Sequence, residues 1–340
     1  MIESVSEHRR TRVQTTTDVL EQLNERMRSQ EETDVRTVPT GFDVLDDVLG
    51  GGLHAGELLL LGGPPGVGKT IAALQWAREL ALAGHTALFA CYEHEPTTLF
   101  VRLLGLEVGE LGGDERFSRG LTRLLAGGDA TGRGVDEVLA DHPVGQQALD
   151  RIRAYADRLI MIRASGAHTT LEQLGELMGE YSQPGTTQVL FVDYLQKIPM
   201  QPEPPTESEK VTRTVEGLKD LSLEHHMPVV LLSAVDSEGM RASRLRLFHL
   251  RGSSAIAFES DVVVMMNSKE KAVSKVHLTY DAVRARGFRD FVVFSVEKNR
   301  GGPNLIDMEH RKDFAHFRFD PEGAMVTEKL VDERLDETDL

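Results

Sequence analysis

The chain has 340 residues, of which 40% are hydrophobic, and its formal net charge is −16. This length is sufficient for one large α/β domain with smaller appendages. The acidic balance argues against a protein that coats DNA with its whole surface, so any contact with nucleic acid must come from a local basic loop or channel. No apolar run approaches the roughly 20 residues that a membrane helix needs, and the polar start, Met1 to Arg12, does not resemble a secretory signal. Cys91 is the single cysteine, which excludes an internal disulfide and a multi-cysteine zinc site and favours a reducing, cytoplasmic setting.

Residues 1–37 are predicted to form an N-terminal arm that carries one short linker helix. The first 16 residues are polar and are expected to be disordered. Leu20, Leu23 and Met27 then follow at helical spacing, so an amphipathic helix is expected to run to about Ser29. Its apolar stripe would pack either on its own domain or on a neighbouring subunit.

Residues 38–320 are predicted to form one α/β domain. Short apolar strands alternate with helices, which is typical of a mostly parallel, twisted sheet with helices on both faces. The expected strands are 57–62, 85–91, 159–162, 188–192 and 228–232, with 262–266 as an additional strand, and the expected helices are 69–83, 170–181 and 208–226. Apolar runs at 291–296, 305–308 and 315–319 are expected to close the sheet in an antiparallel set.

Three segments do not fit this alternation. Glycine-rich residues 109–134 and residues 268–289 are interpreted as insertions in the domain. Residues 321–340 are interpreted as an acidic tail that is solvated and not structural.

The strongest motif is residues 63–70, which match the G-x-x-x-x-G-K-[ST] phosphate loop. An apolar strand is predicted before it and an amphipathic helix after it, so that backbone N–H groups and the helix N-terminus would face the phosphates. Lys69 is expected to reach the β- and γ-phosphates of ATP, and the Thr70 hydroxyl is expected to ligate Mg²⁺. The loop reads Gly63-Pro64-Pro65-Gly66-Val67-Gly68-Lys69-Thr70.

Two carboxylates are placed by the predicted strands near this loop. Asp193 ends the strand 188–192, and at the carboxyl end of a parallel strand it would hold Mg²⁺ through water. Glu93 follows the strand 85–91, where it could orient and deprotonate the attacking water as a general base. Glu95 is a close competitor for this role.

The order of several motifs resembles the RecA, RadA, KaiC and DnaB-type ATPases. Residues 40–56, which include Thr-Gly-Phe-Asp and three consecutive glycines, are similar to the start of the RecA, RadA and KaiC domains. Asp-Tyr-Leu-Gln at 193–196 resembles the second nucleotide motif of DnaB-type replicative helicases, and residues 218–230 resemble the helix and strand that follow it. Lys-Asn-Arg-Gly-Gly-Pro at 298–303 resembles a DnaB and RadA segment that reaches into a neighbour's site. The resemblance covers roughly residues 40–319.

This resemblance implies a RecA-like P-loop NTPase core that is closest to the C-terminal ATPase domain of DnaB helicases. It also implies a homo-oligomer, a hexameric ring, in which Glu93 is the catalytic base and Lys298 and Arg300 complete the next subunit's site. A guanidinium placed on the γ-phosphate stabilises charge that grows in the transition state. The helix before residue 38 stands where DnaB-type proteins carry a linker helix, whereas their large N-terminal domain and the zinc finger of RadA have no counterpart in this sequence.

The segment between Asp236 and Ser254 carries four arginines against two acids. In the family this region lines the pore of the ring and grips single-stranded DNA through electrostatic, sequence-blind phosphate contacts. The sequence departs from the DnaB pattern here: Ala234 replaces a glutamine that is thought to relay the nucleotide state, and residues 251–254 lack a glutamate and a glycine. The predicted DNA-binding residues are Arg241, Arg244, Arg246 and Arg251.

Three functions are compatible with the sequence. The first is a ring-forming ATPase that translocates on or unwinds single-stranded DNA. The second is a KaiC-like regulatory ATPase that switches protein partners without DNA, which the acidic charge, Ala234 and the missing N-terminal domain favour. The third is a nucleotide-stabilised assembly protein without catalysis, against which the intact set of Lys69, Glu93, Asp193 and Arg300 argues.

Overall fold

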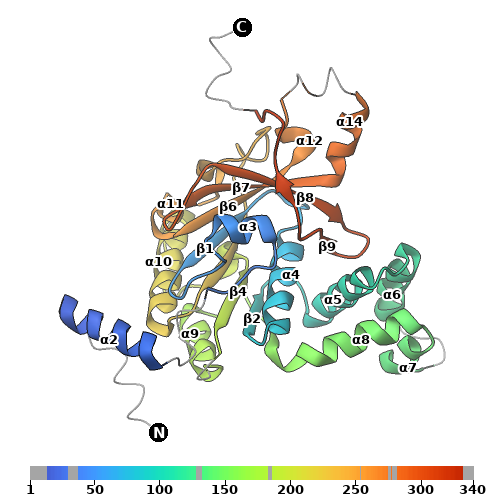
Figure 1. Cartoon of the computed structure of the whole chain (residues 1–340), viewed down its shortest axis with the longest axis horizontal. Helices are drawn as coiled ribbons and strands as arrows, with labels where there is room; N and C mark the ends of the chain where they lie inside the picture. Colours follow the sequence, from blue (N-terminus) through green and yellow to red (C-terminus); the bar gives the residue numbers. More distant parts are fainter. Residues whose placement is uncertain are drawn as a thin grey trace.

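The computed structural model describes residues 14–29, 37–127, 132–182, 186–252, 254–274, 277 and 282–331. In this part of the chain a ten-stranded sheet has the order β10-β8-β7-β6-β1-β5-β4-β2-β3, and β9 pairs with β8 (Figure 1). The strands from β6 to β3 in this order are parallel, and β7, β8, β9 and β10 continue the sheet antiparallel. The predicted fold class, a mostly parallel RecA-like α/β sheet, is therefore confirmed.

The parallel strands are short and apolar because both faces of the sheet are covered. Their bounds are β1 Leu58–Gly62, β2 Thr86–Cys91, β3 Leu159–Arg163, β4 Gln188–Asp193, β5 Val229–Ser233 and β6 Val262–Ser268. The antiparallel strands are β7 Phe291–Asn299, β8 Ile306–Asp313, β9 Arg318–Phe319 and β10 Ala324–Met325.

Alternate side chains of each central strand enter two different cores. In β1, Leu59 and Leu61 belong to one core, which also contains Trp76, whereas Leu58 and Leu60 belong to the other. The first core lies under α3 (Asp43–Val48) and α4 (Lys69–Leu82). The second lies under α9 (Leu171–Glu180) and α10 (Glu207–His225). Burial on both faces thus fixes the register of the sheet, and with it the edge at which the loops meet.

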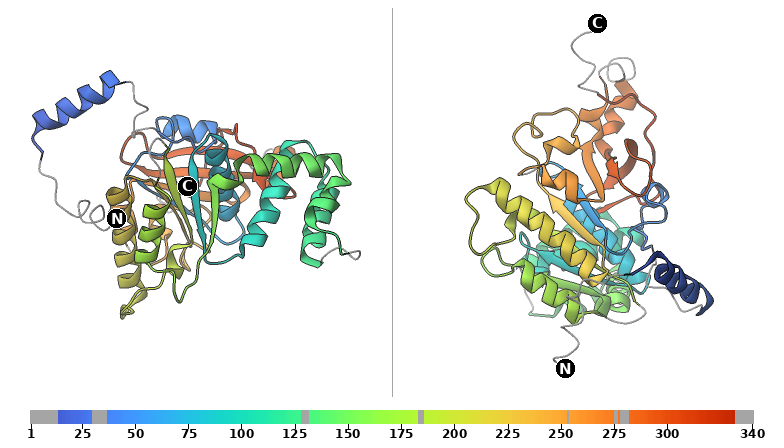
Figure 2. Two further views of the ribbon diagram at one scale, coloured as in Figure 1. Left: turned by 90° about the horizontal axis from the view of Figure 1, so that it is seen from below. Right: turned by 90° about the vertical axis from the view of Figure 1, so that its left-hand side faces the viewer.

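The glycine-rich segment that the sequence marked as an insertion is part of a group of helices. These helices extend to one side of the sheet in Figures 1 and 2, and their bounds are α5 Pro96–Glu110, α6 Glu115–Gly127, α7 Val135–Ala140 and α8 Pro143–Tyr155. Glu107 of α5 is fully buried and accepts two 2.7 Å hydrogen bonds from Arg78 of α4. The Tyr155 hydroxyl of α8 donates to the same carboxylate at 3.0 Å. This buried ion pair anchors the helices to the sheet.

The remaining short helices border the antiparallel strands. They are α11 Ala255–Glu259, α12 Lys269–Ala272 and α14 Ala282–Gly287, with 3₁₀ turns at Ala156–Arg158, Leu195–Lys197, Leu247–His249 and Phe288–Asp290. None of the helices in the described residues is long and apolar enough to span a bilayer.

The predicted N-terminal helix is present as α2, Thr16–Ser29. It lies apart from the sheet in Figures 1 and 2, and its apolar side chains Val19, Leu20 and Leu23 are 41–57% exposed. These three side chains are therefore not buried against the other described residues. The expected disorder of the first residues concerns positions that, up to residue 13, lie outside the described residues.

The first part of the predicted acidic tail is packed, and not solvated as expected. Residues 324–325 form β10 on β8, and Leu330 is 8% exposed in a small core with Val273 and Phe288. Glu328 forms a 2.9 Å ion pair with Lys269, and both side chains are buried. Charged and apolar residues alternate in this segment, so its sequence did not indicate that Leu330 and Glu328 are buried. Residues 332–340 of the predicted tail lie outside the described residues.

Candidate nucleotide site

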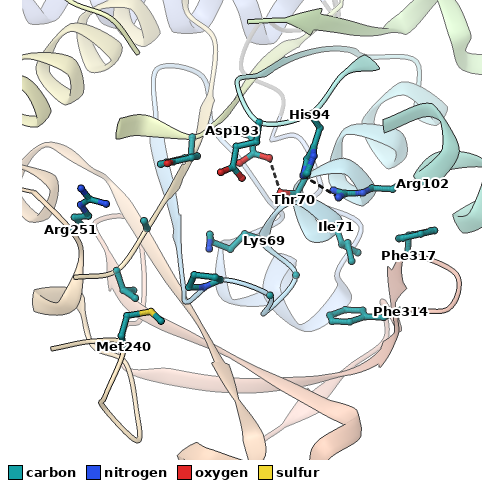
Figure 3. A pocket seen from close by; sticks show the side chains of 17 residues that line it. Lys69, Thr70, Ile71, His94, Arg102, Asp193, Met240, Arg251, Phe314 and Phe317 are labelled. Atoms are coloured by element: carbon teal, nitrogen blue, oxygen red, sulfur yellow. Dashed lines mark hydrogen bonds between the residues drawn. The ribbon is translucent and has the colours of Figure 1, made fainter. Parts of the chain in front are cut away.

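A cavity of about 590 Å³ lies where the phosphate loop meets the carboxyl ends of the central strands (Figure 3). Parallel strands all end at this edge of the sheet, so residues from distant parts of the sequence converge there. The cavity is lined by Lys69, Thr70, Glu93 and Asp193, among others.

Glycine is required in the phosphate loop for two reasons. Gly66 and Gly68 have φ values of 78° and 104°, which L side chains rarely adopt. A Cβ at Gly68 would also lie 2.6 Å from the Phe319 ring and 2.9 Å from the Phe314 ring. The loop therefore turns tightly against the segment after β8, and α4 begins immediately behind it with its N-terminus at the cavity.

Lys69 is a partly buried cation, and no carboxylate among the described residues forms a hydrogen bond or ion pair with it. Its Nζ donates to the carbonyl oxygens of Gly63 at 2.7 Å and Pro64 at 3.1 Å. Burial lowers the pKa of Lys69, although Asp193 and Glu93 oppose this shift. An anionic ligand in the loop would supply the missing counter-charge, which is the expected state of a phosphate-binding lysine.

Thr70 and Asp193 meet across the site although 123 residues separate them. The Thr70 hydroxyl donates to Asp193 Oδ2 at 2.7 Å, and Asp193 is 2% exposed. Burial raises the pKa of Asp193, while the hydrogen bond from Thr70 lowers it. Among the described residues no three acidic, histidine or cysteine side chains form a metal cluster. Two hard oxygens beside a phosphate site fit Mg²⁺, which is usually held by few protein ligands together with phosphates.

The structure separates the two candidate bases. Glu93 is exposed and lines the cavity. Glu95 stands at the N-cap position of α5, and its side chain forms a 2.7 Å ion pair with Arg163 on the surface. Glu93 therefore faces the reaction space, and Glu95 is engaged elsewhere.

Lys298 and Arg300 lie at the opposite edge of the sheet. In the register of β6 and β7, Lys298 pairs with Val263 and Asn299 with Val262, at the amino end of β6. The phosphate loop follows the carboxyl end of β1, which runs parallel to β6 and has five residues, a length of about 13 Å. Neither side chain can therefore reach the phosphate loop of its own chain.

Both cations have partners within the chain at that edge. Lys298 Nζ donates to the carbonyl oxygens of Ala257 at 2.7 Å and Ser260 at 2.5 Å, at the C-terminal end of α11. Arg300 forms a 3.1 Å ion pair with Asp261 and also donates to the carbonyl oxygen of Phe258.

Two of the four predicted loop arginines form ion pairs inside the domain. Arg244 is 8% exposed and donates two hydrogen bonds to Asp307 at 2.8 and 2.7 Å. Arg246 is paired at 2.9 Å with the buried Glu297. Both charges are paired inside the domain, because acids far along the chain approach them.

The other two arginines are exposed. Arg241 has no ion-pair partner among the residues that the structure describes. Arg251 lines the cavity and forms a surface ion pair with Glu207 at 2.8 Å. The loop thus offers fewer free charges than its sequence indicates.

Sequence reasoning missed several residues that line the cavity, and four of them add charge or aromatic rings to it. Arg102 of α5 and His94 lie beside Thr70 and contact each other at 3.1 Å, and Phe314 and Phe317 come from the segment between β8 and β9 (Figure 3). No local motif marks them. Arg102 could have been suspected because it lies two turns into a helix that leaves the strand end of Glu93, whereas the phenylalanines arrive only through the antiparallel strands.

Together the strand order, the phosphate loop and the Thr70–Asp193 contact define a RecA-like P-loop ATPase domain. The family model of the DnaB-like helicase C terminal domain matches residues 139–319, more than half of the chain, and a KaiC ATPase model matches residues 38–118. The chain belongs to the DnaB-like helicase C-terminal domain family.

Individual relatives agree with this family. The replicative DNA helicase DnaB of Treponema pallidum is 27% identical over 306 residues, and that of Leifsonia xyli is 29% identical over 273 residues. These alignments include 88% and 78% of this chain but only 59% and 52% of the helicases, so the chain spans about half the length of the curated relatives it matches.

Solved structures show the same fold. One solved ATPase domain superposes with a TM-score of 0.71 at 16% identity, covering 91% of this chain and 99% of that domain. A DnaB-like replicative helicase, studied with its interactions with primase, has a TM-score of 0.68 at 16% identity, covering 91% of this chain and 67% of that one.

Proposed function

We propose that this chain is an ATP-hydrolysing motor that assembles into a homo-hexameric ring and translocates on or unwinds single-stranded DNA. The observation that carries the proposal is the separation of the site into two edges. Lys69, Thr70, Glu93 and Asp193 converge on one cavity, whereas Lys298 and Arg300 lie at the other end of the sheet. Membership of a helicase family supports the same conclusion.

In the proposed reaction each side chain has one role. The phosphate loop and Lys69 bind the phosphates of ATP, and Thr70 and Asp193 hold Mg²⁺, which supplies charge neutralisation when bound. Glu93 orients the attacking water and accepts its proton. Lys298 and Arg300 of a neighbouring subunit stabilise the negative charge that develops on the γ-phosphate.

A site completed from outside makes hydrolysis depend on assembly. A closed ring of identical subunits places the same two surfaces at every contact, so each cavity can receive one pair of cations. The exposed stripe of α2 is a second surface that a neighbour could cover. Arg241 and Arg251 are the loop arginines that remain for contacts with DNA phosphates.

A KaiC-like regulatory ATPase that acts on a protein partner is the second candidate. The KaiC model matches residues 38–118, and the loss of Arg244 and Arg246 to internal ion pairs weakens the case for DNA. A non-catalytic assembly protein is less well supported, since Glu93 lines the cavity beside an intact phosphate site.

One assay separates these functions. ATP hydrolysis by the full chain is measured with Mg²⁺ at low salt, with and without single-stranded DNA, after its assembly state has been determined. We expect hydrolysis that single-stranded DNA stimulates. Hydrolysis by an assembled ring that neither binds DNA nor responds to it would replace the helicase with the protein-switching ATPase, and a chain that binds but never hydrolyses ATP would support the assembly protein.

A further inference from the structure

Arg102 is a cation of the cavity that the roles above leave unused. It lies two turns into α5, where the buried neighbours Leu103, Leu104 and Leu106 fix the helix against the domain. Its side chain is half-buried and lines the same cavity as Lys69. In Figure 3 Lys69 and Arg102 lie on either side of Thr70. A rigid helix therefore holds a second positive charge at the phosphate loop.

Arg102 differs from three other arginines of this domain in what it contacts. Arg78, Arg244 and Arg246 each bind a carboxylate at 2.7–2.9 Å. Among the described residues no carboxylate lies within 4.0 Å of the Arg102 guanidinium. Its hydrogen bond at 3.1 Å is to the Nε2 atom of His94, a neutral acceptor. A guanidinium that is partly withdrawn from water without a counter-ion is unfavourable, so the site is set up for an anion.

Lys69 shows the same pattern: its partners are carbonyl oxygens, and no carboxylate in the described part of the chain contacts it. Burial lowers the pKa of both Lys69 and Arg102, and in both cases the negative charge of Asp193 opposes the shift. Lys69 and Arg102 therefore lie in similar surroundings. Because Lys69 is expected to bind phosphate, the same ligand is expected for Arg102.

His94 has the chemistry needed to hold the guanidinium. An arginine can only donate, so His94 Nε2 must accept and the ring must be neutral. Burial and the charge of Arg102 both lower the pKa of His94, with Glu93 opposing, which favours the neutral ring. The backbone N–H of His94 donates to Cys91 Sγ at 3.3 Å and so places the residue at the end of β2.

We propose that Arg102 is a phosphate-binding residue of the chain's own nucleotide site, and that His94 is the positioning residue that aims its guanidinium into the cavity. The ligand class is a nucleoside di- or triphosphate, whose anionic oxygens provide the counter-charge that no described carboxylate provides at contact distance. The planar guanidinium of arginine can donate two parallel hydrogen bonds to phosphate oxygens, whereas the ammonium group of lysine acts as a point charge. The inference rests on the nucleotide part of the proposed function and is independent of DNA.

The test measures the dissociation constant of MgADP for the full chain by calorimetry. Arg102→Gln should raise this constant about tenfold to a hundredfold, the effect of losing a hydrogen bond to a charged group. Arg102→Lys should recover part of the loss. Arg119→Gln removes an exposed arginine of α6 that is paired with Glu115, and it should bind like the unmutated chain.

His94 is tested through its coupling to Arg102. His94→Ala should weaken MgADP binding less than Arg102→Gln does, and His94→Gln, which keeps an acceptor, should bind nearly normally. In the double variant His94→Ala should add no further loss to Arg102→Gln, because it acts through that side chain. Additive losses would overturn the positioning role.

Thermal unfolding with and without MgADP separates binding from folding. A phosphate contact predicts that Arg102→Gln reduces the stabilisation by MgADP, whereas a purely structural role would lower the midpoint equally in both conditions. MgADP binding by Arg102→Gln within twofold of the unmutated chain would overturn the inference alone. Failure of the unmutated chain to bind MgADP would instead refute the proposed function.

Discussion

At the scale of single residues, Glu93 and Glu95 both follow β2 and are only two positions apart, but their side chains have different surroundings. Glu93 faces the cavity, and Glu95 binds Arg163 on the surface. The sequence alone could not separate them, because both follow a strand that ends at the nucleotide edge. The choice depends on side-chain direction and on Arg163, which comes from the neighbouring strand β3.

Glu93→Gln should reduce ATP turnover by about 100-fold or more while MgATP still binds, because the proposed general base is lost and the phosphate loop is intact. Glu95→Gln is the matched control and should keep most of the turnover, since an exposed ion pair contributes little. Both variants are compared in single-turnover hydrolysis and in nucleotide binding. The reverse pattern would assign the base to Glu95.

The arginine loop yields a second contrast between residues. Arg244→Ala should destabilise the domain by about 3 kcal/mol, because it leaves Asp307 without its buried partner. Arg241→Ala should not change the stability, and together with Arg251→Ala it should weaken single-stranded DNA binding. Each lost phosphate contact should reduce the slope of log affinity against log salt by roughly 0.7. Urea unfolding and DNA titrations at several salt concentrations measure the two effects. Stable Arg244→Ala protein with weakened DNA binding would restore the original assignment of Arg244.

Sequence reasoning could place residues that belong to one contiguous motif, but it could not predict contacts between residues far apart in the chain. The phosphate loop is one contiguous motif, so its residues could be placed from the sequence. Asp193 could be placed because strand ends converge. The pairing of Arg244 with Asp307 joins residues 63 positions apart, and no local pattern reports it. Arg102 was missed for the same reason, since its neighbours are supplied by the fold.

At the scale of elements, the strands were predictable because burial on both faces forces short apolar runs. The four helices α5 to α8 were not predicted. Glycines interrupt the local pattern around α6, and α7 is only six residues long. For the C-terminal segment the prediction of a solvated tail was wrong up to residue 331. Its acidic composition gave no sign that Leu330 is buried or that Glu328 pairs with Lys269.

Removal of residues 327–340 should therefore destabilise the domain. It deletes the buried Leu330 side chain, worth about 2 kcal/mol or more, and leaves Lys269 with one carboxylate partner fewer. Removal of residues 332–340 alone keeps both contacts and serves as the control. Thermal unfolding of the two truncated chains checks this expectation, and equal midpoints would show that the segment does not contribute to the fold.

At the scale of the whole molecule, the two halves of the proposed catalytic site face away from each other. Lys298 and Arg300 are held at their edge by α11 and Asp261, and the sheet separates them from the phosphate loop. A single chain therefore cannot combine Glu93 with Arg300 in one site. Head-to-tail contacts between identical chains would bring the two edges together and, if the rotation closes, would produce the proposed ring.

Mixed assemblies test this arrangement. Rings made only of Glu93→Gln subunits lack the base, and rings made only of Arg300→Ala subunits lack the trans cation, so both should hydrolyse ATP slowly. In a mixed ring, an Arg300→Ala subunit supplies an intact phosphate site and Glu93, and a neighbouring Glu93→Gln subunit supplies Arg300. Some contacts then contain both groups, and activity should rise to a maximum at intermediate mixing ratios. Mixing is verified by tagging one variant and recovering both from the same assembly. If verified mixed rings stay inactive at every ratio while rings mixed with unmutated subunits are active, Arg300 does not act across the contact, and the two-edge argument for a ring-dependent ATPase fails.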